Sequence, residues 1–287
     1  MAAQPPIFKG CEAAAGGSRP PRIARSMPGL RTVAATRYLT PLREGGSLPA
    51  IVEADDEGLY VLKFRGAGQG AKALVAELLA GEIGRRLGLP VPEIVLAELH
   101  ADLARTEPDP EIQDLIRASA GLNFAIDYLP GALSFDPVAD RIDPDLASRI
   151  VWFDAFVANL DRTPRNTNLL VWHRRPWLID HGAALYFHHD WAGFEAQARH
   201  PFPLIREHVL LAGATRLDEN DAEMTQRLDT SALQDVIALV PDAWLADPGY
   251  EQEAGPPREV YLRFLQQRLA SPRAFVEEAR RAHALHV

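Results

Sequence analysis

The chain has 287 residues, enough for one large domain or two small ones, and its 47% hydrophobic and 24% charged residues are typical of a folded globular protein. Its 30 basic and 39 acidic residues give a formal net charge of −9, which argues against nucleic acid as a partner. The single cysteine, Cys11, excludes an internal disulfide and a cysteine-based zinc site, and no apolar stretch reaches the ~20 residues that span a bilayer. We therefore expect a cytoplasmic protein with no membrane or nucleic-acid partner.

Residues 1–30 differ from the rest of the chain. They are rich in alanine, proline, glycine and arginine and show no apolar period. They also lack the central apolar run of a secretory signal. We interpret them as a disordered tail, or as an extension of the gene model upstream of a true start at Met27.

From residue 31 the pattern becomes that of a small sheet with one helix. Short strands bounded by turn-forming residues precede and follow the helix, which ends at Gly88. Because consecutive strands joined by tight turns pair in opposite directions, we expect an antiparallel sheet. The expected strands cover residues 32–39, 49–54, 58–64, 91–99 and 123–128, and the helix covers residues 71–87.

After residue 131 the chain becomes mainly helical. The first helix has an apolar face that repeats every three or four residues, at Leu146, Ile150, Phe153 and Val157. Asp154 is expected to point away from that face and to make a local hydrogen bond. Two short apolar runs follow at 168–172 and 176–179, and further helices are expected near 204–211, 219–228, 231–239 and 257–284.

One glycine-rich motif allows a different interpretation. Gly66-x-Gly68-x-x-Ala71 follows a strand and precedes a helix, and Glu98 stands near the end of the next strand, which matches a loose dinucleotide-binding pattern. That pattern would indicate a Rossmann-type oxidoreductase. Two strands joined by tight turns precede the motif, however, and no alternation of strands and helices follows it. A glycine-rich surface turn is therefore favoured.

A second group of residues predicts phosphoryl transfer. This reaction needs a carboxylate to accept the proton of the attacking hydroxyl, and oxygen ligands for magnesium. Asp161 and Asn166, on a loop after a buried helix, can supply the carboxylate and a neutral ligand, and Asp180 a charged ligand. Lys63 lies in an apolar strand, where an ammonium group needs an anion. A phosphate oxygen together with the carboxylate of Glu77 would provide it.

Together these segments resemble the HipA-like kinases, which have the two-lobed fold of the protein kinases and of the phosphatidylinositol 3- and 4-kinases. The resemblance covers roughly residues 31–245 and is closest to the small stand-alone branch of that group. It rests on the motifs Tyr60-Val-Leu-Lys63-Phe, Leu87-Gly-Leu-Pro-Val-Pro92, Asn159-Leu-Asp161-Arg-x3-Asn166 and Ile179-Asp180-His-Gly182.

The resemblance implies a role for each candidate residue. Lys63 would contact the α- and β-phosphates of ATP, with Glu77 as its ion-pair partner. Asp161 would be the catalytic base, and Asn166 and Asp180 would hold Mg²⁺.

The resemblance also implies how the rest of the nucleotide is bound. Segment 124–131 would be the hinge that meets adenine through its backbone, and Asp127 would reach the ribose. The turn that contains Gly45, Gly46 and Ser47 would take the place of the phosphate-covering loop, with backbone N–H groups available to the phosphates.

The expected architecture is therefore an α+β, protein-kinase-like fold with two lobes. An antiparallel sheet plus one helix would form the N-terminal lobe over residues 31–125, a hinge would follow at 126–131, and a larger helical lobe would cover 132–287. The expected activity is ATP- and Mg²⁺-dependent phosphorylation of a hydroxyl, on a protein Ser or Thr or on a small molecule, by a bacterial kinase. A nucleotide-binding pseudokinase, an oxidoreductase and a non-catalytic scaffold remain alternatives.

Overall fold

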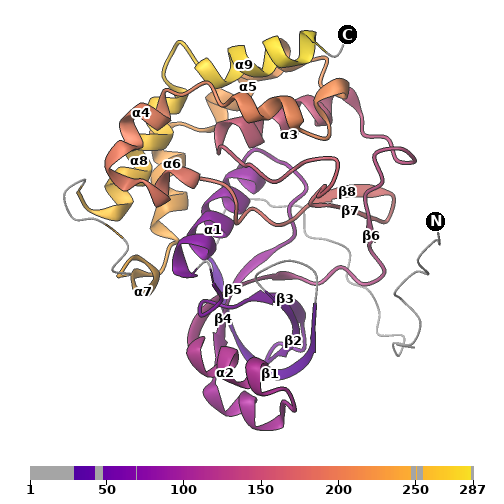
Figure 1. The fold of residues 1–287 in the computed structure, drawn as a ribbon, viewed down its shortest axis with the longest axis vertical. Coiled ribbons are helices and arrows are strands. Elements are labelled where there is room, and N and C mark those ends of the chain that lie inside the picture. Colours follow the sequence, from indigo (N-terminus) through magenta and orange to yellow (C-terminus); the bar gives the residue numbers. More distant parts are fainter. Residues whose placement is uncertain (1–28, 43–47, 69, 247–249, 251–254, 286–287) are drawn as a thin grey trace.

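The computed structural model describes residues 29–42, 48–68, 70–246, 250 and 255–285. A small barrel of strands and a larger group of helices are visible in Figure 1, with α1 (Gly70–Arg86) between them. The tail over residues 1–28 and the turn with Gly45, Gly46 and Ser47 lie outside the described residues. The predictions made for those two segments stay predictions.

The strands of the barrel are β1 (Arg31–Pro41), β2 (Ala50–Ala54), β3 (Leu59–Lys63), β4 (Ile94–Leu99) and β5 (Gly121–Asp127). They close in the order β1-β2-β3-β5-β4. Neighbours are antiparallel, as predicted, except for β1 and β4, which pair in parallel and complete the ring. The sequence did not predict this pair, because the two strands are distant in the chain and no turn motif links them.

Side chains alternate between the inside and the outside of the barrel. On β2 and β3 every second residue is buried in the barrel core. Tyr60 and Leu62 belong to this core, so the side chains of Val61 and Lys63 lie on the other face of β3. The alternation thus places Lys63 outside the barrel, toward the rest of the protein.

Two short helices beside the barrel were not predicted. The 3-10 helix η1 (Ala101–Thr106) packs against α2 (Pro110–Ala118), and Ile112 and Ile116 of α2 join the barrel core. The side chain of Asp109 caps the first turn of α2. Aspartate followed by proline is a helix-start signal, so the sequence did contain the evidence for this helix.

Helix α1 connects the barrel to the helical region. It packs against β4 and β5 and also against α6 (Thr230–Ala238) and α7 (Asp242–Leu245). Its apolar residues share one continuous core with those of α3 (Pro144–Phe156). The helix expected to belong to the N-terminal lobe is therefore equally part of the larger core, and the lobe boundaries at 125 and 132 stay a prediction.

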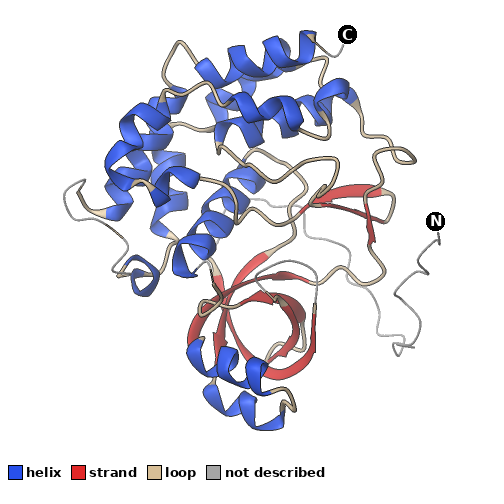
Figure 2. Ribbon diagram, in the orientation of Figure 1, coloured by secondary structure: helices blue, strands red, loops and turns tan. Residues whose placement is uncertain are grey.

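The second half of the chain is mainly helical, as predicted (Figure 2). The helix expected over 257–284 is two helices, since Pro272 between them lacks an amide hydrogen. In place of the helix expected near 204–211 stand the 3-10 turns η4 (Pro203–Glu207) and η5 (Leu211–Gly213). The remaining elements are β6 (Leu133–Ser134), β7 (Leu169–Trp172), β8 (Arg175–Leu178), η2 (Tyr186–His189), η3 (Trp191–Gly193), α4 (Phe194–Ala198), α5 (Leu217–Arg227), α8 (Pro257–Leu269) and α9 (Ala274–Ala284).

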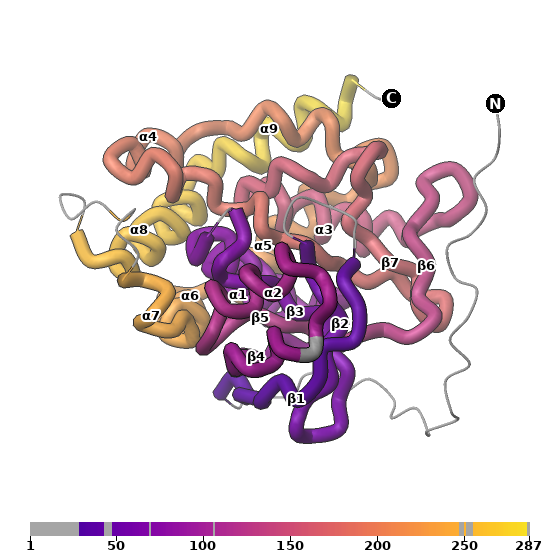
Figure 3. The backbone as a smooth tube through the Cα atoms, turned by 60° about the horizontal axis from the view of Figure 1, so that its bottom comes forward, coloured from indigo at the N-terminus to yellow at the C-terminus, as the bar shows by residue number. Residues whose placement is uncertain are grey.

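The small strands β6, β7 and β8 form a separate antiparallel sheet. Figure 3 shows the barrel strands and α2 in front of the helical region. Among the described helices, none combines the length and the apolar character needed to cross a membrane.

Candidate active site

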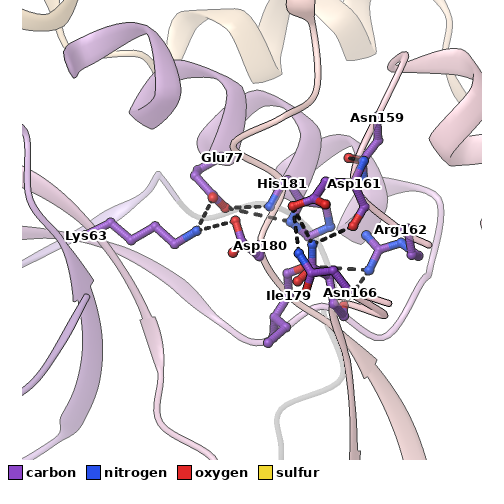
Figure 4. A network of polar contacts seen from close by, with 10 residues as sticks. Lys63, Glu77, Asn159, Asp161, Arg162, Asn166, Ile179, Asp180 and His181 are labelled. Carbon is purple, nitrogen blue, oxygen red and sulfur yellow. Dashed lines mark hydrogen bonds and ion pairs between the residues drawn. The ribbon is translucent and has the colours of Figure 1, made fainter. Parts of the chain in front are cut away.

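Lys63 meets two carboxylates where the barrel joins the helical region (Figure 4). It is the last residue of β3 and only 9% exposed. Its Nζ donates one hydrogen bond to Oε1 of Glu77, in the middle of α1, and another to Oδ1 of Asp180 at 2.7 Å. The ion pair expected between Lys63 and Glu77 is therefore present, and it extends to Asp180.

Close contacts fix the segment after β8 against α1. The backbone N–H of His181 donates to Oε2 of Glu77 at 2.9 Å. At Gly182 a Cβ atom would lie only 2.9 Å from Oε1 of Glu77, so a larger residue would displace the carboxylate that binds Lys63. Asp180 is therefore presented to Lys63 by a backbone that packs directly on α1.

Burial and charge act on the pKa values of this group in opposite directions. Burial raises the pKa of Glu77 to about 7, although Lys63 opposes this shift. Burial also works against the ionisation of Asp180, but Lys63 outweighs it and lowers the pKa of that carboxyl to about 2. For Lys63, burial is outweighed by the two carboxylates, which raise its pKa. Lys63 and Asp180 are thus both charged at neutral pH.

Asp161, Asn166 and Asn168 form a second group, on the loop after α3. Nδ2 of Asn166 donates to Oδ2 of Asp161 at 2.7 Å. Nδ2 of Asn168 donates to the carbonyl oxygen of Asp161 at 2.8 Å and, at 3.4 Å, to its Oδ2. Asn166 is exposed and Asp161 is partly exposed, in contrast to Lys63 and Glu77. The two amides therefore orient a carboxylate that remains accessible.

One buried guanidinium connects the two groups. Nη1 of Arg162 donates to the carbonyl oxygen of Asn168 and, at 3.5 Å, to that of Ile179, the residue before Asp180. The backbone N–H of Ile179 donates to the same carbonyl of Asn168 at 3.1 Å. The loop of Asp161 and the segment of Asp180 are therefore held together, as Figure 4 shows.

Asp154 supports Arg162 and corrects an expectation. The sequence placed it on an outward face with a local hydrogen bond, but it is fully buried. Its carboxylate accepts hydrogen bonds from Arg162, Asn159 and His208, at 2.6, 2.8 and 2.9 Å. Burial disfavours its ionisation, but Arg162 and His208 together lower its pKa. The missed signal was an acidic residue within the apolar run 151–157, where a carboxylate needs partners.

Three partly buried apolar side chains lie on the face of the barrel that carries Lys63. Ile51 pairs with Val61 across β2 and β3, and Val61 pairs with Ile126 across β3 and β5. Directly paired residues share a face, and Val61 is two residues before Lys63, so all four side chains point the same way. The sequence analysis included Ile126 in the segment expected to meet adenine but missed Ile51 and Val61, although alternation along β3 could have identified Val61.

Asp127 does not lie on that face. It pairs with Tyr60, whose side chain is in the barrel core, so its carboxyl is on the opposite face from Lys63. Burial and the nearby charge of Glu93 raise the pKa of Asp127 to about 6, with Arg31 opposing the shift. The ribose contact expected of Asp127 stays a prediction, and the register gives it no support.

Comparison with known proteins decides the family. A family model described as HipA-like kinase matches residues 36–273. This chain belongs to the HipA-like kinase family. No curated protein matches it.

Solved structures similar to this HipA-like kinase include other kinases. The crystal structure of the proinflammatory kinase CtkA of Helicobacter pylori is 12% identical, covers 87% of this chain and 96% of its own, and has a TM-score of 0.55. A Golgi casein kinase structure with Mn and ADP bound is 11% identical, covers 87% of this chain and 74% of its own, and has a TM-score of 0.44. The similarity to CtkA supports the kinase-like fold, and the predicted fold class is confirmed.

In this HipA-like kinase the exposed side-chain oxygen atoms of the site suit a hard divalent cation as ligands. The side chain of Asp180 is 45% exposed, and Lys63 engages its Oδ1. Asn166 donates to Asp161 through Nδ2 and so offers a neutral amide oxygen. Within the described part of the chain, no cluster of three or more His, Cys, Asp or Glu side chains could hold a metal by itself. A Mg²⁺ ion here would need further oxygen ligands, which nucleotide phosphates supply.

Proposed function

We propose that this HipA-like kinase transfers the γ-phosphoryl group of ATP to a hydroxyl in a Mg²⁺-dependent reaction, with a protein Ser or Thr as the acceptor class. Family membership and the kinase fold support a phosphotransferase. One observation carries the proposal: Nζ of Lys63 donates hydrogen bonds to both Glu77 and Asp180. Arg162, in turn, connects the segment of Asp180 to the loop of Asp161. An ammonium, a carboxylate for metal and a carboxylate for proton transfer therefore belong to one network.

The nucleotide would lie along the outer face of β3. Ile51, Val61 and Ile126 offer an apolar surface to the base, and Lys63 follows two residues after Val61 on the same face. At 3.3 Å per residue, this spacing separates the base from the phosphates by about 7 Å along the strand, before the reach of the lysine side chain is added. Lys63 would then stabilise negative charge on the phosphates, held in place by Glu77.

Asp161 would accept the proton of the acceptor hydroxyl. As the hydroxyl oxygen bonds to the γ-phosphorus, the bond to the bridging oxygen of ADP breaks and the proton moves to the carboxylate. Oδ2 of Asp161 already accepts from Asn166, and among the described residues none donates to Oδ1, which is available for the hydroxyl. Bound Mg²⁺, with Asp180 and Asn166 as protein ligands, would neutralise charge on the phosphates.

Ligand-induced thermal stabilisation tests the nucleotide. ATP with Mg²⁺ at ~100 times its dissociation constant should add about 2.7 kcal/mol to the free energy of unfolding, and NAD should add nothing. Stabilisation by NAD and not by ATP with Mg²⁺ would instead favour a dinucleotide-binding protein, and a response to neither would favour a scaffold.

ADP release tests turnover. Incubation with ATP, Mg²⁺ and pools of Ser- and Thr-containing peptides should release ADP and label the peptides with γ-phosphate. ATP binding without ADP release for any acceptor would indicate a pseudokinase.

A further inference from the structure

His208 is a buried histidine that the proposed reaction does not use. It directly follows η4, and both of its ring nitrogens have partners. Nδ1 lies 3.0 Å from the backbone nitrogen of Leu210, and Nε2 lies 2.9 Å from Oδ2 of Asp154. A backbone N–H group can only donate, so Nδ1 must accept. The proton of the neutral ring is therefore on Nε2, which donates it to Asp154.

His208 orients the carboxylate of Asp154 through a hydrogen bond, and it can do so as a neutral ring. Arg162 already balances the carboxylate, and burial lowers the pKa of His208 although Asp154 opposes the shift. Oδ2 of Asp154 accepts from both Arg162 and His208, and Oδ1 accepts from Asn159. Donors from separate positions in the chain therefore fix the plane of one buried carboxylate.

The segment of His208 is also bonded to the loop that carries the candidate base. The backbone N–H of Val209 donates to the carbonyl oxygen of Arg162 at 3.0 Å. Arg162 directly follows Asp161, and its guanidinium reaches the carbonyl of Ile179, next to Asp180. Residues 208–209 thus contact both the backbone of Arg162 and the carboxylate that orients its side chain.

We propose that His208 is a positioning residue for phosphoryl transfer, which acts through Asp154 and Arg162 on the placement of Asp161 and Asp180. This inference rests on the proposed function, because it assigns His208 a part in that reaction. Without the Nε2–H donor, the carboxylate of Asp154 can turn about its Cβ–Cγ bond, and the guanidinium it holds can follow. A displacement of about 1 Å at reacting groups lowers rates on the order of 10²-fold.

Two amide substitutions separate the two hydrogen bonds of the ring. His208→Gln places an amide nitrogen as many bonds from Cα as Nε2, so it can still donate to Asp154. His208→Asn places an amide oxygen as many bonds from Cα as Nδ1, so it keeps the bond from Leu210 and loses the one to Asp154. His173→Asn, at an exposed histidine with φ of 48°, is the matched control.

The first readout is the kinetics of ATP turnover. We expect His208→Asn to lower kcat about 10–100-fold while the KM for ATP stays within about threefold of wild type. His208→Gln should recover most of the loss. Equal kcat values in the Asn and Gln variants, with both folded by urea titration, would overturn the proposal. If His208→Asn does not fold, His208→Met, which has no donor at the ε position, takes its place with the same expectations.

The second readout does not depend on activity. Hydrogen exchange of the amides in 159–168 and 177–181 should accelerate in His208→Asn and return to the wild-type rate in His208→Gln. Unchanged exchange in His208→Asn would overturn the role of His208. A wild-type protein that releases no ADP would overturn the proposed transferase instead, and the exchange data would then decide on His208 alone.

Discussion

The two halves of the candidate site are built differently. Lys63 and Glu77 are 9% and 2% exposed, and they bond to each other from β3 and α1. Asp161 and Asn166 are five residues apart on one loop, and the amide of Asn166 is exposed. The first half forms when α1 packs beside β3, and it meets the rest of the site through the contact of Lys63 with Asp180. The second half is local, and Arg162 attaches it to the rest.

Because of this difference, we expect the buried half to affect mainly stability and the loop half to affect mainly catalysis. Removing one partner of a buried ion pair leaves the other charge buried and uncompensated, which destabilises the folded state. A partly exposed loop carboxylate such as that of Asp161 contributes less to stability and is accessible to the hydroxyl whose proton it would accept. Substitutions in the two halves should therefore affect different measurements.

The largest expected effect is that of Asp161→Asn on turnover. Removing the group that accepts the proton should lower kcat by roughly 10²–10⁴-fold, while ATP binding stays within about twofold and the free energy of unfolding within about 0.5 kcal/mol. ADP release, thermal stabilisation by ATP and urea unfolding measure the three quantities. Asp114→Asn, at a side chain 80% exposed on α2, is the control and should change none of them. A wild-type kcat in Asp161→Asn would contradict the assignment of the base.

The next effect is that of Lys63→Met on stability. Methionine keeps most of the volume and removes the charge, which leaves Glu77 and Asp180 without their cation. We expect a loss of about 3–5 kcal/mol in urea unfolding, together with loss of stabilisation by ATP. The double variant Lys63→Met with Glu77→Leu should recover part of the lost stability but no ATP binding.

An exposed pair gives the comparison for this loss. Arg37 and Glu53 form an ion pair in which the side chain of Arg37 is largely exposed. Arg37→Met should therefore cost less than about 1 kcal/mol. Equal losses of unfolding free energy in Lys63→Met and Arg37→Met would show that breaking the buried pair costs no more than breaking an exposed one.

Two buried histidines each make a contribution to stability that is lost in acid. His181 lies beside Glu77, and burial followed by the charge of Arg162 lowers the pKa of His181 to about 3; burial also lowers the pKa of His208. Below the unfolded-state histidine pKa of about 6.5 the unfolded chain binds more protons, so the contribution of each histidine is full above that pH and falls as pH decreases. The raised pKa of Glu77, about 7, acts in the opposite direction. Each histidine contributes a slope of up to about 1.4 kcal/mol per pH unit.

Urea unfolding between about pH 7.5 and pH 5 measures this slope. His208→Gln removes one titrating group and should reduce the slope by up to about 1.4 kcal/mol per pH unit, whereas His173→Asn should leave it unchanged. A slope that is the same in wild type and His208→Gln would mean that His208 does not titrate with unfolding.

The local half of the site was the more predictable one. Asp161 and Asn166 are five residues apart on one loop, and together with Asp180 this spacing predicted that both serve one site. Lys63 was identified because a charged residue in an apolar strand needs a partner, and Glu77 lies on the next helix. The contact of Lys63 with Asp180 spans 117 residues, and no local pattern encodes it. The family resemblance placed both residues at the nucleotide but did not predict that they touch.

Contacts that depend on how elements pack were beyond the sequence. The strands β1, β2 and β3 followed from turns and alternation, but the parallel closure of β1 on β4 depends on the twist and number of strands. The bond between Asp154 and His208 joins residues 54 apart. His208 directly follows a 3-10 turn, in a stretch for which the pattern suggested a regular helix. Periodicity shows that a face is buried but does not identify what covers it.

Asp127 gives the smallest and most discriminating test. Its pKa of about 6, against an ordinary value of 3.8, means that its ionised form is unfavourable in the folded protein. The favourable contribution is full below about pH 4 and is lost as pH rises through 6. Asp127→Asn cannot ionise, so at about pH 8 it should be more stable than wild type by about 1 kcal/mol after allowance for partial exposure, and the difference should vanish near pH 4.

The same variant decides which face of β5 the nucleotide uses. If the ligand lies with Lys63, Val61 and Ile126, Asp127→Asn should leave the affinity for ATP within about twofold, because its side chain is on the barrel side of the strand. A loss of ATP affinity of tenfold or more, about 1.4 kcal/mol, would place the ribose at Asp127 after all. The strand would then have to present two adjacent residues to one ligand, which regular pleating does not allow, so the hinge would have to change its backbone conformation when ATP binds.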